Sequence, residues 1–142
     1  MATIGIFTGG VNTPATVTET ALTGTDTFTY DSSGVLVIRN STGASATVTL
    51  TGSASTGSKL VEGGGTVALS GGVPVVVGAG AVKSIKLGSI RDFLKGTIAV
   101  TGGVAGVFAY ILKYSMGQGW PTFLYGACYE AYSLHRPAGH QV

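Results

Sequence analysis

The sequence predicts an all-β fold, either an antiparallel β-sandwich or a β-barrel, and three observations support this prediction. The 142 residues include 19 threonines and 24 glycines; threonine favours pleated strands, whereas glycine favours turns and bulges. Short alternating or apolar runs recur at intervals of roughly 8–12 residues, as in sandwiches and barrels. The sequence also lacks the alternation of strands and helices that is typical of parallel sheets. We therefore expect about seven to nine short strands.

The first two strands are expected at residues 25–30 and 35–40. The first segment alternates threonine with larger residues, and the second is a β-branched apolar run. Between them lies Asp31-Ser32-Ser33-Gly34, a sequence in which aspartate and glycine favour a turn. These segments predict a hairpin with a four-residue loop.

The next strand, residues 46–51, alternates strictly. Ala46, Val48 and Leu50 point one way and three threonines point the other, which predicts a half-buried strand. A loop is expected at residues 52–65. The remaining strands are expected at 66–69, 73–77 and 82–87, with a weak one near 59–62 and a closing hairpin of 97–101 with 104–112 through Gly102-Gly103.

One short helix is expected near residues 89–95. Ser89 is its candidate N-cap, Asp92 follows three residues later as in a short capping box, and Gly96 ends it. Ile90, Phe93 and Leu94 would share one face.

Composition divides the chain into an N-terminal arm at residues 1–23, a β body at 24–112 and a C-terminal extension at 113–142. The extension holds six of the twelve aromatic residues. Such a shift in composition indicates a boundary.

Charge is low and dispersed, at 10% of residues with a net charge of +2. Because the basic residues form no cluster, we expect no nucleic-acid partner. A nearly neutral surface favours association between molecules. The N-terminal residues lack the pattern of a secretory signal, and the apolar stretch at 98–112 is too short and too interrupted to span a bilayer. We therefore expect a chain that is soluble in the cytoplasm where it is made, with no membrane partner.

The residues that could carry chemistry are few and scattered. Six carboxylates occur singly along the chain, so we expect no enzyme, no catalytic residues and no cofactor. The residues Cys128, Glu130, His135 and His140 match no compact zinc pattern, and no metal site is expected. The glycine-rich stretches at 63–65 and 78–80 fit no phosphate-binding loop and are read as turns.

Two segments are candidates for contact with other subunits, because they carry apolar or aromatic residues outside the body. Tyrosine and tryptophan favour interfaces, and an N-terminal segment can add as a strand to a neighbouring sheet. The alternatives are that the rings fold back on their own core and that the N-terminus frays. The interface candidates are Ile4, Ile6, Phe7, Tyr114, Trp120, Phe123, Tyr125 and Tyr129.

The threonine- and glycine-rich segment from Ala21, together with the stretch Leu94 to Gly102, resembles small head proteins of tailed bacteriophages, the decoration or cement proteins. The resemblance extends to Leu112, about two thirds of the chain. It implies a β-sandwich or β-barrel body, self-association as homotrimers, binding to the major capsid protein on the outside of the virion, stabilisation of the shell and no cofactor. The segment from Lys113 onward is not part of this pattern.

Other functions stay open from the sequence. One is another phage structural part, such as a tail-tube, head–tail joining or fibre-base protein. A second is a carbohydrate-binding β module, in which Trp120 and Tyr125 would stack on sugars. An enzyme with a dispersed site is the remaining alternative.

Overall fold

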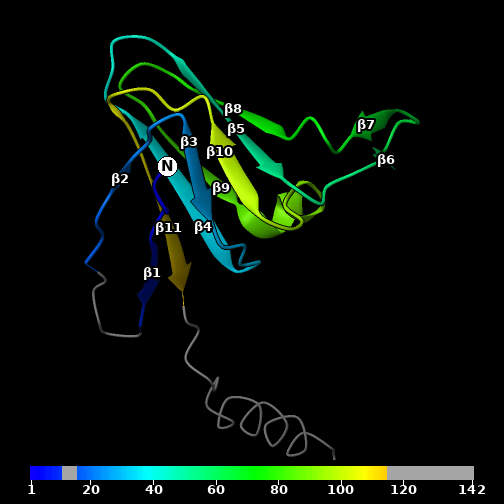
Figure 1. Cartoon of the computed structure of the whole chain (residues 1–142), viewed down its shortest axis with the longest axis horizontal. Coiled ribbons are helices and arrows are strands. Elements are labelled where there is room, and N and C mark those ends of the chain that lie inside the picture. The colour runs from blue at the N-terminus through cyan, green and yellow to red at the C-terminus, as the bar shows by residue number, and fades with distance from the viewer. Residues whose placement is uncertain (11–15, 115–142) are drawn as a thin grey trace, which may run out of the picture.

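The computed structural model describes residues 1–10 and 16–114, which fold into a β-sandwich with one short helix (Figure 1). The strands are β1 (Ile6–Gly9), β2 (Thr20–Ala21), β3 (Thr25–Phe28), β4 (Gly34–Asn40), β5 (Ala46–Gly52), β6 (Ser58–Leu60), β7 (Thr66–Ala68), β8 (Val73–Val77), β9 (Val82–Lys86), β10 (Ile98–Thr101) and β11 (Val107–Tyr114). The helix is η1 (Leu87–Phe93), and it has 3₁₀ geometry.

Two sheets, one of five strands and one of four, form the sandwich. The first sheet has the order β1-β11-β4-β9, with β2 also paired to β11, and the second has the order β3-β10-β5-β8. All pairings in them are antiparallel except that of β1 with β11. The pairs β2–β11, β3–β10, β4–β9 and β5–β8 are nested within one another. This nesting is the strand order of a jelly roll, so the predicted all-β sandwich is confirmed.

The predicted hairpin of residues 25–30 with 35–40 is wrong. Strand β3 pairs with β10, whereas β4 pairs with β9 and β11, so the two strands lie in opposite sheets. The turn itself forms, because the Asp31 carboxylate accepts hydrogen bonds from the Ser33 N–H and hydroxyl at 2.9 and 2.6 Å. The inward residues of the two strands pack into the same core, but they enter it from opposite sheets.

The predicted closing hairpin of residues 97–101 with 104–112 is also wrong, for the same reason. Strand β10 pairs with β3 and β5 of the second sheet, whereas β11 pairs with β4 of the first. Val100 and Val107 are both buried in the core from opposite sheets. Gly102 has a φ of +80°, and its backbone passes close to the carbonyl oxygen of Thr47 where the chain turns away from β10. Glycine allows both this conformation and this close approach.

A helix is present near residues 89–95, but its predicted start is wrong. The helix begins at Leu87, and Lys86 occupies the N-cap position with no side-chain capping bond. Ser89 instead donates its hydroxyl proton to the Lys86 carbonyl at 2.7 Å. Leu87 is fully buried in the core, and this burial places the first turn two residues earlier than capping chemistry predicts.

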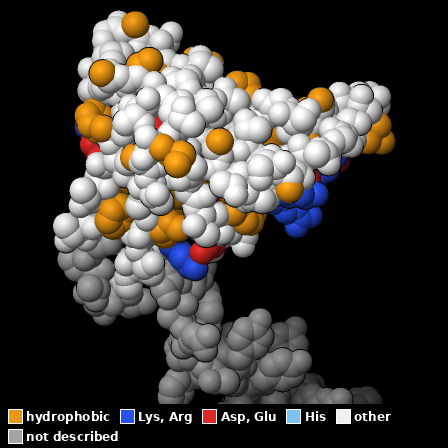
Figure 2. Space-filling model, viewed as in Figure 1, with side chains coloured by type: hydrophobic (Ala, Val, Ile, Leu, Met, Phe, Trp, Pro, Cys, Tyr) orange, Lys and Arg blue, Asp and Glu red, His pale blue; other side chains and the backbone are white. Residues whose placement is uncertain are grey.

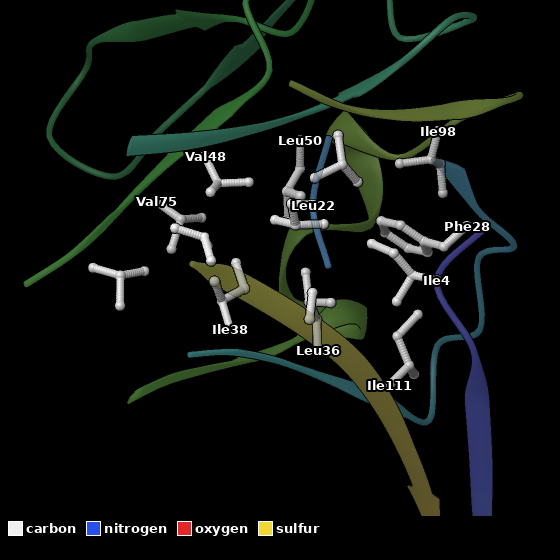
Figure 3. Packing of buried hydrophobic residues seen from close by; sticks show 14 of the residues in the cluster. Ile4, Leu22, Phe28, Leu36, Ile38, Val48, Leu50, Val75, Ile98 and Ile111 are labelled. Atoms are coloured by element: carbon white, nitrogen blue, oxygen red, sulfur yellow. The ribbon is translucent and has the colours of Figure 1, made fainter. Parts of the chain in front are cut away.

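One cluster of apolar side chains fills the space between the sheets (Figure 3). The predicted inward face of β5 is confirmed, because its alternate residues are buried and the threonines between them point away from the core. The buried cluster comprises Ile4, Leu22, Phe28, Leu36, Ile38, Ala46, Val48, Leu50, Val75, Val77, Leu87, Leu94, Ile98, Val100, Val107, Ala109 and Ile111.

The N-terminal segment belongs to both sheets. Residues 2–4 run beside β3, where the Ile4 N–H donates to the Thr27 carbonyl at 2.8 Å and the Thr27 N–H donates to the Ala2 carbonyl at 2.9 Å. The following strand, β1, crosses to pair with β11. The segment therefore covers one open side of the sandwich.

Asp26 holds this segment in place. Its carboxylate is fully buried and accepts hydrogen bonds from the N–H of Ala2 at 2.8 Å, and from the N–H and hydroxyl of Thr23 at 2.7 Å each. Burial acts to raise the pKa of Asp26, but the bonds from Thr23 and Ala2 outweigh it, so the pKa lies below its usual value.

Candidate interaction surface

A projecting hairpin, β6–β7, is the part of the described chain that buries least. Every residue from 56 to 68 is exposed, and Figure 1 shows the hairpin extending from the sandwich beyond the ends of β5 and β8. We call residues 56–68 the arm. Its apolar side chains stand in water: Leu60 is 69% exposed and Val67 is 40% exposed. Figure 2 shows hydrophobic side chains on this projection.

The arm joins the sandwich through few contacts. At its base the Leu69 N–H donates to the Gly57 carbonyl at 2.9 Å, and the Leu69 side chain is buried. An ion pair between Lys59 and Asp92 links the arm to η1. This bond lowers the pKa of Asp92, and it uses the carboxylate that the sequence assigned to a capping box. The arm is thus tethered at its base and free along its length.

The outer faces of the two sheets differ in chemistry. Outward positions of the β3-β10-β5-β8 sheet are mostly threonines, namely Thr25, Thr27, Thr47, Thr49, Thr51 and Thr101. Outward positions of the other sheet are mostly aliphatic or aromatic. We call this second set the apolar face; it comprises Phe7, Val35, Val37, Phe108, Tyr110 and Leu112.

Strand register places the members of the apolar face side by side. Phe7 lies opposite Leu112, which lies opposite Val35, and Tyr110 lies opposite Val37. Residues in register share a face of the sheet. Their neighbours along each strand point into the core, whereas these six belong neither to the core cluster nor to the side chains packed on it. Val37 is nevertheless buried, with 7% exposure, and the other five are half-buried. The apolar face is therefore separate from the core.

Arg39 closes one end of the apolar face. Its guanidinium lies 4.6 Å from the centre of the Phe108 ring and pairs with Glu19 at 2.5 Å. The pairing lowers the pKa of Glu19 through the hydrogen bond from Arg39. Stacking of this kind keeps the charge in water while its carbon stem covers the ring.

The sheet edges on the β8–β9 side are blocked against a further strand. Pro74 in β8 has no N–H to donate, and the Val76 carbonyl of β8 accepts a bond of 3.1 Å from the Lys83 ammonium. Lys83 belongs to β9, so its side chain bridges the two edges. Proline and lysine are typical protections of edge strands. Association through these edges is therefore disfavoured.

The structure places only part of the predicted interface set. Ile4 lies in the core, Ile6 is 38% exposed at the edge of the first sheet, and Phe7 is half-buried on the apolar face. Tyr114 ends β11. The candidates Trp120, Phe123, Tyr125 and Tyr129, and the rejected metal set Cys128, Glu130, His135 and His140, lie outside the described residues.

Sequence reasoning found both strands of the arm, with a weak one near 59–62 and another at 66–69, but it read residues 52–65 mainly as a loop and did not pair the two as a hairpin. The signal was present, since two short segments with β-branched residues flank the triplet Gly63-Gly64-Gly65, which is a hairpin pattern. The turn closes through the Val61 N–H, which donates to the Gly65 carbonyl at 2.9 Å. The apolar face was equally readable in alternate residues of 107–112, but inward and outward apolar residues together resemble a buried strand.

The charged groups act as links between segments. Glu19 pairs with Arg39, Asp31 with Lys113 and Asp92 with Lys59, and each pair joins distant parts of the chain. Within residues 1–10 and 16–114, no three potential metal ligands come together. These pairs organise structure, and their arrangement offers no converged set of acids and bases among the described residues.

Comparisons with protein-family models, curated proteins and solved structures found no match. In the part of the chain that the structure describes, no helix has the length and apolar character needed to cross a membrane.

Proposed function

We propose that this protein is a structural component of a virus particle that binds the outside of the capsid and stabilises the shell. It acts as a homo-oligomer, with trimers as the expected form, and contacts the major capsid protein. This role requires contact surface between subunits and no catalysed reaction.

The arm is the observation that carries this proposal. A two-stranded hairpin alone is at best marginally stable in water. This one places Leu60, Val61 and Val67 in solvent and has no core of its own. A projection of this kind gains stability when it lies against another protein, because contact removes apolar surface from water.

The strand order adds support by analogy. Double-sheet jelly rolls occur in viral capsid proteins and also in lectins. Because one fold hosts many functions, the analogy alone does not choose between them. The apolar face favours protein contact, since sugar recognition relies on polar groups placed around an aromatic platform, and this face presents mainly aliphatic and aromatic carbon.

Weak contacts suffice for such a role. Many copies on one shell engage neighbouring capsid subunits together, and linked contacts give an avidity far above that of one contact.

The test is quantitative mass spectrometry and a reconstruction of purified particles that carry the protein. We expect a copy number set by icosahedral symmetry and density on the outer surface of the shell. Density at the tail or at the head–tail joint, or rings of six or twelve in solution, would support the other phage structural roles instead. Binding to a glycan array together with absence from particles would support the carbohydrate module.

A further inference from the structure

We propose that the arm of one copy docks on the apolar face of a second copy of this chain. This inference rests on the proposed function in that it names a contact between subunits. It can be tested without the particle.

The two surfaces belong to different sheets of the sandwich. The arm extends from the connection between β5 and β8 of the second sheet, whereas the apolar face lies on the outer side of the first. All arm residues remain exposed, so its apolar side chains are left uncovered by the described part of its own chain. Two different patches that meet between copies form a head-to-tail contact, which generates a ring when its rotation closes.

Apolar chemistry matches across the proposed contact. The arm offers the aliphatic side chains of Leu60, Val61 and Val67 on a narrow projection. The apolar face presents half-buried rings and branched carbons, including Tyr110 and Leu112, side by side on the outer side of the first sheet. Aromatic residues are enriched where a protein surface receives a partner.

Charge also matches. Glu62, at the tip of the arm, is the one carboxylate among the described residues with neither an ion pair nor a hydrogen bond from another described residue. Lys86 of β9 lies in register with Val35 at the border of the apolar face, and its ammonium forms no ion pair with any described residue. Opposite charges at the rim of an interface fix its orientation more than its strength.

The contact is expected to be modest. The arm has 13 residues, fewer than the roughly 20–30 that each side of a standard interface supplies. Association should therefore depend on concentration, and sedimentation velocity over a wide concentration range is the suitable measurement.

The first experiment compares the full chain with the double variant Leu60→Ser, Val67→Ser. Because both side chains are in water, the fold should persist, while the dissociation constant should rise at least about tenfold. The matched control is Val104→Ser, since Val104 is 50% exposed in the β10–β11 connection, on neither surface. Unchanged association of the arm variant, or equal weakening by the control, overturns the proposal.

The second experiment uses charge reversal to test which surface receives the arm. Glu62→Lys and Lys86→Glu should each weaken association about fivefold. Mixing these two variants should restore it, because the arm of each then faces an opposite charge on the other. If Lys86→Glu has no effect, the arm docks elsewhere and the proposal fails.

The outcomes separate this inference from the proposed function. A wild-type chain that stays monomeric at every concentration but binds the outside of particles overturns the inference and the expected homo-oligomer, while the capsid-binding role stands. A chain that associates through the arm but is absent from particles overturns the function alone.

Discussion

The buried carboxylate of Asp26 accepts a hydrogen bond of 2.8 Å from the backbone N–H of Ala2, 24 positions earlier in the chain. With the two bonds from Thr23, this contact fixes the segment that pairs first with β3 and then with β11. A single buried acid thus determines how one side of the sandwich is covered.

Replacing Asp26 should destabilise the whole fold. Asp26→Ala leaves three donors without their acceptor in a buried site, so we expect a loss of about 3 kcal/mol in the free energy of unfolding. Urea unfolding measures the loss, and hydrogen exchange should show the Ile4 and Thr27 amides losing protection. Glu62→Gln is the control, because that carboxylate is exposed and should change stability by less than about 0.5 kcal/mol. An Asp26→Ala protein as stable as wild type would contradict this role.

Acid should weaken the protein through its bonded carboxylates. The hydrogen bond from Lys113, aided by Ser33, lowers the pKa of Asp31 from 3.8 to about 2. Because the pKa of Asp31 is lower in the folded state than in the unfolded state, the stability that this carboxylate contributes is complete above the unfolded-state pKa. That contribution is lost as the pH falls through the folded-state pKa. Stability should therefore decline between about pH 4 and pH 2, as measured by urea unfolding at fixed ionic strength.

The variant Asp31→Asn tests the source of this decline. It should lower stability near neutral pH slightly and flatten the curve below pH 4, because the residue no longer titrates. Asp26, Glu19 and Asp92 also have lowered pKa values and should retain part of the slope. A curve of wild-type steepness in the variant would show that Asp31 is not involved.

Alanine substitutions at three glycines distinguish the effect of steric crowding from that of backbone strain. At Gly102 a Cβ would lie 2.4 Å from the Thr47 carbonyl oxygen, and φ is +80°; at Gly80 φ is +65° with open space; Gly43 has neither constraint. Alanine should therefore cost about 3 kcal/mol or more at Gly102, about 1 kcal/mol at Gly80 and little at Gly43. Thermal unfolding ranks the three variants. Equal effects at all three positions would show that the close approach beneath Thr47 is not maintained in solution.

The tether between Lys59 and Asp92 should control the arm without controlling the fold. Lys59→Ala should leave the midpoint of thermal unfolding nearly unchanged, because an exposed pair contributes about 0.2–1 kcal/mol. Amides that pair β6 with β7 should exchange up to about fivefold faster. Asp92→Ala should have the same effect, and the double variant should add nothing further. A large drop in the unfolding midpoint would mean that the arm is part of the cooperative core.

Local pattern was enough to find most of the strands. The alternation in residues 46–51 predicted which side chains of β5 enter the core, because strand geometry sends successive residues to opposite faces. The turn at Asp31 was also readable, since its side chain bonds its own backbone two residues later.

Strand partnership was decided at long range. A turn after β3 is compatible with a chain that folds back beside itself and with a chain that crosses to the opposite sheet. The choice depended on Phe28 and Leu36, which bury together in one core with residues far along the sequence. Burial in the same core also explains why η1 begins at Leu87, although the capping pattern favoured a start at Ser89.

Local sequence therefore determined most of the strands from β3 onward and the two faces of β5, because these properties depend on neighbours one or two positions away. Only the tertiary structure decided three other features: the assignment of strands to sheets, the position of the N-terminal segment beside Asp26 and the projection of the arm. They depend on burial shared between residues that meet from distant parts of the chain.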